Sequence, residues 1–367
     1  MWISKGRRKS TVEASRVSAA GGSFHAPRLP STVFLILLSS HCLLPSAYGS
    51  AARGLYEVRE LKPGIFLWIP EDVLDVDGDP RFSRTATSAF VITPEGVVVV
   101  NTTNSPFHAR EVLYEIHRRT ELPIRYVINT DAHGDIMMGN EVFVDQQAVI
   151  ISTAAAQAEM RWYRANLAQQ LREDENWRLQ ARMRGIHPTP AAQAFDAEMT
   201  LGPGGQEIRV IRMSGGHSPG DAVVHVPAQK VLVLGHLFEN GFFPRMAASN
   251  VRRWIEILRD VESWDVEVYV PAHGLPGGKK EVAGFRQFLE WLVNEVYARI
   301  QVGKPLNEVK RELHLTEIYR WSAREQAARA VEEVFQQLTR ERFASPAEAA
   351  PTAGTAPASS PLPTPQR

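Results

Sequence analysis

The feature that most constrains this chain is the order of its segments between about residue 50 and residue 343, where short β-type runs followed by helical stretches occur twice. Alternating or continuously apolar runs come first in each half, and apolar residues at helical spacing follow. A sheet that is apolar on its faces must be covered by another layer. We therefore expect an α/β protein built as an αββα sandwich, with two mixed β-sheets packed together and flanked by helices.

The first half contains a loop that places polar side chains directly after a buried strand. Four β segments are predicted at 56–59, 64–68, 88–92 and 97–100, and Ser105 and Pro106 then begin a helix that we expect to end near Arg119. An apolar strand predicted at 124–128 leads into the loop 129–140, which carries Asp131, His133 and Asp135. Ligands in β-α-β units bind beyond the carboxyl ends of the strands, so chemistry is expected at this loop.

A long helical segment separates the two halves. It runs from Ala154 to about Arg184 and carries Trp162, Tyr163, Leu167 and Leu171 on one side. We favour ordinary packing of an amphipathic helix; the alternative is an apolar wall over a cleft, made with Trp162, Tyr163 and Trp177. The later β and helical segments are predicted at 199–201, 208–211, 222–226, 231–234, 251–261, 266–270, 279–302 and 323–340.

The two ends of the chain differ from the region between them. Arg7, Arg8 and Lys9 precede an apolar stretch and then small residues up to Gly49, an order typical of a secretory signal. The apolar stretch is shorter than the roughly 20 residues of a spanning helix, so we expect export to the periplasm or medium, with an uncleaved membrane anchor as the alternative. The expected organisation is a leader at 1–49, one domain at 50–343 and a disordered Pro- and Ala-rich tail at 344–367.

Charge and cysteine content exclude several kinds of partner and site. Lys and Arg number 41 and Asp and Glu number 41, so no net basic field favours nucleic acid or, unless the leader stays attached, a stable membrane partner. Cys42 is the only cysteine, which excludes intrachain disulfides, Cys-rich zinc modules and iron–sulfur clusters. Any metal must be held by His and carboxylate side chains, and the expected partner is a small-molecule substrate.

Four of the eleven histidines occupy positions that suit ligands. His133, His217, His236 and His273 each follow an apolar strand in a Gly-containing loop, as expected of side chains that converge on one end of a sheet. By contrast, His108 lies among charged residues of a predicted helix, and we expect it at the surface.

Four motifs carry a resemblance to a known family. The segment 130–136, TDAHGDI, resembles the signature T-H-x-H-x-D-H of the metallo-β-lactamase superfamily, and 216–220, GHSPG, resembles its G-H-[TS]-x-G motif. The segment 234–238, LGHLF, falls where the family has L-x-G-D-x-[FL], and 270–274, VPAHG, resembles V-P-G-H-G. Their order over roughly residues 55 to 275 implies the αββα sandwich of the metallo-β-lactamase type and a metal-dependent hydrolase.

The chain departs from the family pattern at three ligand positions. Asp131 replaces the first His, Ile136 replaces the His after the motif Asp, and His236 replaces the bridging Asp. The resemblance implies one metal site formed by Asp131, His133 and His217, and a second formed by Asp135, His236 and His273. Each set has two imidazoles and one carboxylate, which suits zinc with an open position or ferrous iron. Because an aliphatic side chain cannot bind metal and a neutral imidazole cannot bridge two ions as a carboxylate does, we expect one well-occupied zinc rather than a standard dinuclear centre.

The exchange of residue types at Asp131 and His236 keeps the number of imidazoles and carboxylates constant, which indicates compensation.

Asp135 is the candidate catalytic residue, because a carboxylate beside a metal-bound water can orient it or pass its proton to the leaving group. Asp221 is expected to hold an imidazole through its second nitrogen.

Two functions follow from these observations. The favoured one is an exported hydrolase that uses a metal-activated water on an ester, thioester, lactone or amide bond. The alternative is a non-catalytic binding protein of the same fold with a degenerate metal site, supported by the three altered positions. The retention of four polar ligand-type residues on loops argues for the hydrolase.

Overall fold

Two β-sheets form the centre of the protein, whose computed structural model describes residues 56–71, 84–173, 180, 183 and 185–343. The first sheet has seven strands in chain order, antiparallel from β1 to β4 and parallel from β4 to β7. Its strands are β1 (Tyr56–Lys62), β2 (Ile65–Pro70), β3 (Ser88–Thr93), β4 (Gly96–Val100), β5 (Ile124–Ile128), β6 (Val149–Thr153) and β7 (Gln193–Phe195). Both hydrogen-bonding patterns occur in it, so the sheet is mixed.

The second sheet has five strands in the order β12-β11-β10-β9-β8. Only the β11–β12 pair is parallel, and the other pairs are antiparallel. Its strands are β8 (Glu198–Leu201), β9 (Ile208–Arg212), β10 (Ala222–Val226), β11 (Val231–Glu239) and β12 (Val268–His273), with short 3₁₀ turns at Pro203–Gly205 and Pro227–Gln229. The parallel pair brings the carboxyl ends of β11 and β12 to the same edge of the sheet.

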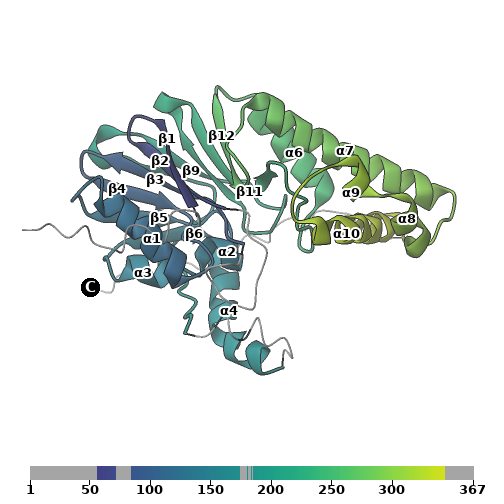
Figure 1. Ribbon diagram of the computed structural model, residues 1–367, viewed down its shortest axis with the longest axis horizontal. Coiled ribbons are helices and arrows are strands. Elements are labelled where there is room, and N and C mark those ends of the chain that lie inside the picture. The colour runs from purple at the N-terminus through teal and green to yellow at the C-terminus, as the bar shows by residue number, and fades with distance from the viewer. Residues whose placement is uncertain (1–55, 72–83, 174–179, 181–182, 184, 344–367) are drawn as a thin grey trace, which may run out of the picture. The chain divides into compact units, whose positions relative to one another are not determined.

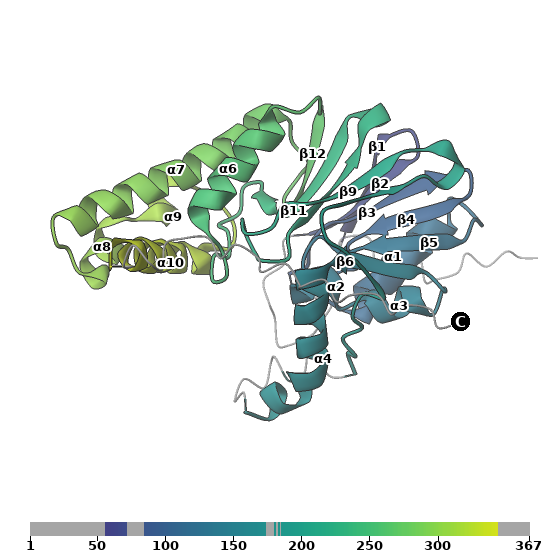
Figure 2. The same ribbon diagram turned by 180° about the vertical axis from the view of Figure 1, so that it is seen from behind.

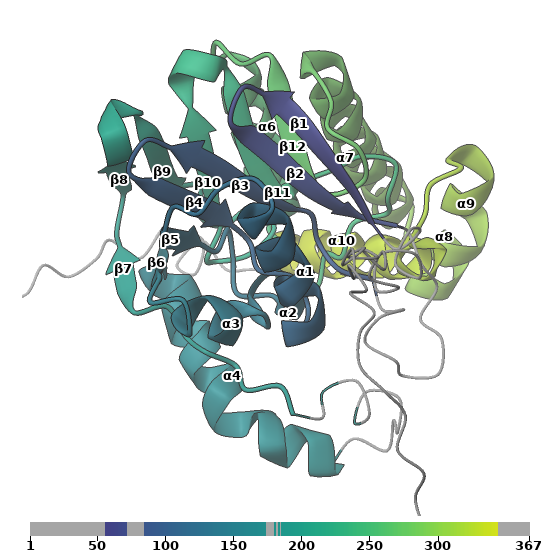
Figure 3. The ribbon, with the colours of Figure 1, turned by 60° about the vertical axis from the view of Figure 1, so that its left-hand side comes forward.

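Helices cover the outer faces of both sheets. Figures 1 and 2 show α1 and α3 on the side of the first sheet and α6 and α7 on the opposite side, with α10 alongside α7 and α4 projecting away from the sheets. The same layers are seen from another direction in Figure 3. The helices are α1 (Pro106–His117), α2 (Gly134–Met137), α3 (Asn140–Val144), α4 (Ala154–Glu173), α6 (Val251–Glu262), α7 (Lys279–Gln301), α8 (Leu306–Glu312), α9 (Leu315–Ile318) and α10 (Arg324–Phe343).

Three apolar clusters correspond to the three interfaces between these layers. One lies between the sheets and joins residues such as Leu67 and Val98 of the first sheet with Val224 and Val233 of the second. Another joins the first sheet to α1, α3 and α4, and the largest joins the second sheet to the C-terminal helices. Because successive side chains of a strand point to opposite faces, each sheet has apolar side chains on both faces, and their packing holds the four layers together.

The αββα sandwich expected from the sequence is confirmed. Ser105 caps α1 as expected, its Oγ accepting from the His108 backbone amide. The expected surface position of His108 is wrong, because its side chain is buried against Trp68 and its Nδ1 lies 2.8 Å from Asn104 Oδ1. The loop expected at 129–140 contains the short helix α2, which begins directly after His133.

The leader at 1–49, with Cys42, the tail at 344–367 and Trp177 lie outside the described residues. Within the described part of the chain, no helix is long and apolar enough to span a bilayer.

Candidate metal centre

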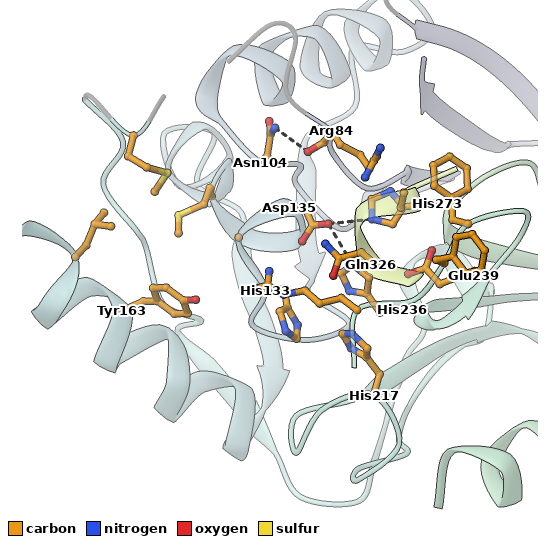
Figure 4. Close-up of a pocket in the computed structure, with 18 of the residues that line it drawn as sticks. Arg84, Asn104, His133, Asp135, Tyr163, His217, His236, Glu239, His273 and Gln326 are labelled. Atoms are coloured by element: carbon orange, nitrogen blue, oxygen red, sulfur yellow. Dashed lines mark hydrogen bonds and ion pairs between the residues drawn. The ribbon is translucent and has the colours of Figure 1, made fainter. Parts of the chain in front are cut away.

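The six side chains predicted as ligands lie close together, and Figure 4 labels all of them except Asp131. Donor atoms of Asp131, His133, His217 and His236 lie within 4.8 Å of one another, and those of Asp135, His236 and His273 do the same. The division into two separate groups of three is therefore not what the structure has, since His236 belongs to both. Each imidazole ring has its centroid within 5.4 Å of the His236 ring.

Backbone contacts from three strands place Asp131. Its neighbour Thr130 follows β5, and the Asn101 side chain at the end of β4 accepts from both the Thr130 amide and its hydroxyl. The amide of Ala222 at the start of β10 donates to the Thr130 carbonyl. Asp131 then accepts from the amide of His133 at 2.8 Å, which fixes the turn that presents both side chains.

Gly235 permits the approach of His236 to Asp131. It has a φ of 56°, and the pairing of β11 with β12 shifts register on either side of it. A Cβ at this position would overlap the Thr130 side chain. Glycine is therefore required both by the backbone conformation and by the close contact between β11 and the loop after β5. The expected loop position of His236 is wrong, because β11 continues to Glu239 and His236 lies within the strand.

His236 lies between two carboxylates and uses both ring nitrogens. Its Nδ1 is 2.7 Å from Asp131 Oδ2, and its Nε2 is 3.2 Å from Asp135 Oδ2. Burial lowers the pKa of His236, but the charges of Asp135 and Asp131 outweigh it and raise that pKa well above its ordinary value. The same pairs hold the pKa of both carboxyls well below normal despite their burial. An imidazolium between two carboxylates therefore offsets one of their two negative charges.

His133 and His217 carry the observation that tests the fit of a metal. The Nδ1 atoms of both rings are buried and have no hydrogen-bond partner among the described residues. They lie 3.2 Å from Asp131 Oδ1 and 3.8 Å from Asp131 Oδ2, respectively. Two donors on one tetrahedral zinc are about 3.4 Å apart, given bonds of about 2.0–2.1 Å. The residues fit a metal ion, because leaving buried imidazole nitrogens unpaired is otherwise costly.

These two imidazoles differ in their electrostatic surroundings. Burial and the charges of His236 and His133 lower the pKa of His217 well below its ordinary value, so its ring is neutral. The T-shaped contact between the His217 and Trp254 rings, 5.3 Å between centroids, orients it. Burial also lowers the pKa of His133, but the charge of Asp131 outweighs this and raises it. His217 is therefore the imidazole best prepared to donate a lone pair.

Asp135, His236 and His273 form the second group. Asp135 Oδ2 is 3.0 Å from His273 Nε2, and its contacts with both imidazoles use this one oxygen. His273 is the last residue of β12, which places it opposite Glu239 in the β11–β12 pair. Glu239 is buried, and burial raises its pKa to about 7 against the charges of His273 and His236. Its Oε2 has no partner among the described residues.

The two groups open into a cavity of about 430 Å³. Sequence reasoning missed several residues that line it, namely Arg84, Asn104, Glu239, Phe242, Arg245 and Gln326. Only Glu239 gave a signal in the sequence: it is an acidic residue at the end of the apolar segment Val231–Glu239. The others come from loops and from α10, whose position at this edge depends on tertiary packing.

Two further expectations about the site are wrong. The position of Ile136, where the family has a His ligand, was expected to face the cavity, but its side chain is fully buried in a small cluster with Ala86 and Ala272 and does not line the cavity. Asp221 does not hold an imidazole; its carboxylate accepts from the Gly216 amide and from the Ser218 amide and hydroxyl. It therefore shapes the loop that presents His217, rather than orienting the ring itself.

The long helix contributes to the cavity, contrary to the favoured interpretation of core packing alone. Tyr163, Leu167 and Leu171 of α4 line it, whereas Trp162 is 52% exposed and lies outside it. Met160 and Ala156, about one and two turns before Tyr163 on the same helix, pack in the core. The helix thus changes from core element to cavity wall along its length.

Two mixed sheets between helices, with His and Asp side chains gathered where several strands end, define an αββα protein with a candidate metal centre at the sheet edge. Residues 83–273 match the model of the family described as the metallo-beta-lactamase superfamily. The chain belongs to this superfamily. The helices α7 to α10 follow the matched region, and Ala323 and Gln326 near the start of α10 line the cavity.

Two solved structures are similar to this chain. A metallo-beta-lactamase from Pontibacter korlensis is 20% identical and superposes with a TM-score of 0.51, covering 64% of this chain and 99% of that one. A metallo beta lactamase from Hirschia baltica is 18% identical, with a TM-score of 0.48 and coverage of 64% and 97%.

Proposed function

We propose that this protein is a metal-dependent hydrolase that uses a metal-activated water on an ester, thioester, lactone or amide bond. The observation that carries the proposal is the pair of buried Nδ1 atoms of His133 and His217, which lie 3.2 and 3.8 Å from Asp131 oxygens but have no hydrogen-bond partner among the described residues. Asp131, His133 and His217 would hold one zinc ion firmly, and ferrous iron suits the same donors. When bound, such an ion lowers the pKa of its water toward 7 and polarises the oxygen of the bond under attack.

The protein's own residues would then position the reactants. Asp135 faces the cavity, and its contacts with His236 and His273 run through Oδ2, so Oδ1 is placed to accept a proton from water and return it to the leaving group. His236 would hold Asp131 and Asp135 in place through its two nitrogens. A second ion in the group of Asp135, His236 and His273 would have to displace the contact between His236 and Asp135, so we expect it to bind more weakly.

We also propose that the protein is exported to the periplasm or medium, and anchored in the membrane if the leader is not cleaved. The support is the basic, apolar and small-residue order before Gly49. N-terminal sequencing of the protein from the producing cells tests this: a start near residue 50 supports cleavage, and an intact Met1 contradicts it.

A non-catalytic binding protein of the same fold is the second candidate. The observation that favours it is the saturation of His236 by two carboxylates, which closes the centre without a metal. In such a protein, the ion pairs of His236 with Asp131 and Asp135 would take the place of a metal, and the cavity would bind a ligand without catalysis.

Metal analysis of the purified protein separates the two candidates. We expect about one equivalent of zinc or iron in the wild type, its loss in H133A and H217A, and its retention in H187A, whose imidazole is 80% exposed and outside the cavity. Hydrolysis of ester, thioester, lactone and amide substrates should follow the metal content. A wild type that binds no added metal, or hydrolysis that is unchanged in both ligand variants, would refute the hydrolase.

A further inference from the structure

The cavity has an apolar side that the metal centre does not explain. Tyr163, Leu167 and Leu171 recur at intervals of four residues, so they form one stripe on α4, and all three line the cavity. Eight residues of α-helix advance about 12 Å, so the stripe continues well beyond the metal-ligand cluster. Figure 4 shows the Tyr163 side chain extending from α4 toward the cluster.

The outer part of this stripe has no partner in the core. Tyr163 still packs against the cluster between the first sheet and its helices, but Leu167 and Leu171 belong to none of the apolar clusters formed by the described residues. Both are half-buried and line the cavity. Apolar side chains kept on a cavity wall favour an apolar ligand, because its binding removes their surface from water.

A cation also lines this cavity. Arg245 is exposed, lines the cavity and makes no ion pair with any described residue. Burial raises the pKa of the Tyr163 hydroxyl, and the charge of Arg245, which lines the same cavity, opposes this. Arg84, the other arginine of the cavity, is already paired with Glu325 at 2.9 Å. Arg245 is therefore the guanidinium available to an anionic ligand.

We propose that the substrate of this hydrolase carries, besides the bond that is cleaved, a free carboxylate and an aliphatic chain, with the carboxylate at Arg245 and the chain along Tyr163, Leu167 and Leu171. This inference rests on the proposed function, because it names the substrate class of the same site. The guanidinium selects the charged group, and the stripe selects chain length. Both selections act on binding, so they are measurable with a ligand that has no bond to hydrolyse.

Binding of octanoate to the full-length protein, measured by isothermal titration calorimetry, tests the proposal. We expect octanoate to bind at least tenfold more tightly than butanoate, because each buried methylene favours binding. Octylamine, which has the same chain and the opposite charge, should bind at least tenfold more weakly than octanoate. Equal affinity for octanoate and butanoate, or for octanoate and octylamine, would overturn the proposal without the need for any variant.

Paired variants test which residues bind the aliphatic chain and which bind the carboxylate. L167Q should weaken octanoate binding about tenfold and leave butanoate unchanged, whereas W162Q, on an exposed part of the same helix, should change neither. R245Q should weaken both carboxylates about tenfold, and R164Q, an exposed arginine of α4 outside this cavity, should weaken neither. Equal effects within either pair would overturn the assignment.

The hydrolase and the substrate class fail in different ways. Octanoate binding that persists in H133A, together with the absence of hydrolysis in the metal-loaded wild type, would refute the hydrolase while retaining the ligand class. Hydrolysis of simple esters without any preference for chain or charge would retain the hydrolase and refute the ligand class.

Discussion

The substitution His236→Asp tests the role of His236 as the internal counter-charge of the site. Its imidazole lies 2.7 Å from Asp131 Oδ2 and 3.2 Å from Asp135 Oδ2, and the side chain is 6% exposed. The variant restores the family's acidic residue but places three carboxylates together. Without a metal, the charge that His236 supplies between Asp131 and Asp135 would be lost.

The expected loss of stability follows from the burial of the two pairs. Removing one partner of a buried ion pair costs about 3–5 kcal/mol, because the other charge is left uncompensated. The pair with Asp131 is almost fully buried, whereas Asp135 is 24% exposed, so we assign the full cost of a buried ion pair only to the contact with Asp131. The free energy of unfolding of H236D in chelator should therefore fall by about 3–5 kcal/mol.

Zinc should reverse most of this loss. A ligand that binds only the folded protein stabilises it by about 2.7 kcal/mol at a concentration 100 times its Kd. The added carboxylate strengthens the site for a divalent cation, so H236D should gain more from zinc than the wild type does. Urea unfolding followed by circular dichroism measures the loss of stability in chelator and its recovery with zinc.

His225→Asp is the matched control. His225 is buried in β10, and neither ring nitrogen has a partner among the described residues. H225D should lose stability equally with and without zinc. An H236D protein as stable as the wild type in chelator, or one that zinc does not rescue, would refute the reasoning.

The same variant completes a test of the compensated pair. Asp131→His in the H236D background restores both family residues at positions that contact each other. Contacting residues in one network typically couple by 0.5–3 kcal/mol, so the double variant should be more stable with zinc than the two single effects predict. Additive effects would show that the exchange of residue types is not compensation.

Three other perturbations test the fold around the site. Gly235→Ala should lower the free energy of unfolding in urea by about 1–3 kcal/mol and weaken zinc binding, because a Cβ there overlaps Thr130. Gly241 has a similar positive φ but open space around it, so Gly241→Ala should cost about 1 kcal/mol and leave zinc binding unchanged. Ile136→His should destabilise the protein by about 1–3 kcal/mol without adding a second metal equivalent by elemental analysis, because the side chain packs in a closed apolar cluster; a second equivalent would contradict this. Burial and the charge of Glu115 raise the pKa of Glu111 to about 7, so the folded state binds more protons than the unfolded state between pH 4.5 and 7, and stability falls as the pH rises through this window. Glu111→Gln should therefore become more stable than the wild type by up to about 3 kcal/mol between pH 5 and pH 8 in urea titrations, and an unchanged difference would refute this, with the exposed Glu121→Gln as control.

Much of the architecture could be predicted from the sequence because its signals are local. The continuous apolar run Val97–Val100 and the Ser105–Pro106 cap specify β4 and the start of α1 through side-chain alternation and backbone hydrogen bonding over a few residues. Misassignments arose where a charged sequence context conceals burial. His108 lies among Arg and Glu residues, yet it is buried because it faces Trp68 rather than solvent.

The candidate ligands themselves could also be predicted, since polar residues in Gly-containing loops after apolar strands are a local pattern. The contacts between these ligands could not be predicted from the sequence. His236 belongs to both groups only because Gly235 lets β11 approach Thr130, and Ile136 is turned away from the cavity by its packing with Ala86 and Ala272. Such contacts join residues that are 50 or 105 positions apart, as in the bonds from Thr85 to Asp135 and from His236 to Asp131.

By itself, the sequence determined the order of strands and helices, the absence of a cysteine-based site and the types of side chain at the sheet ends, because each depends on the chemistry of neighbouring residues. Only the tertiary structure decided which donors lie close enough to share an ion, which imidazole is paired with carboxylates and which face of α4 lines the cavity. These depend on distances of a few ångströms between separate elements. The neighbouring charges then set the charge state of Asp131, His236 and Asp135 against the effect of burial, because little water is left to screen them.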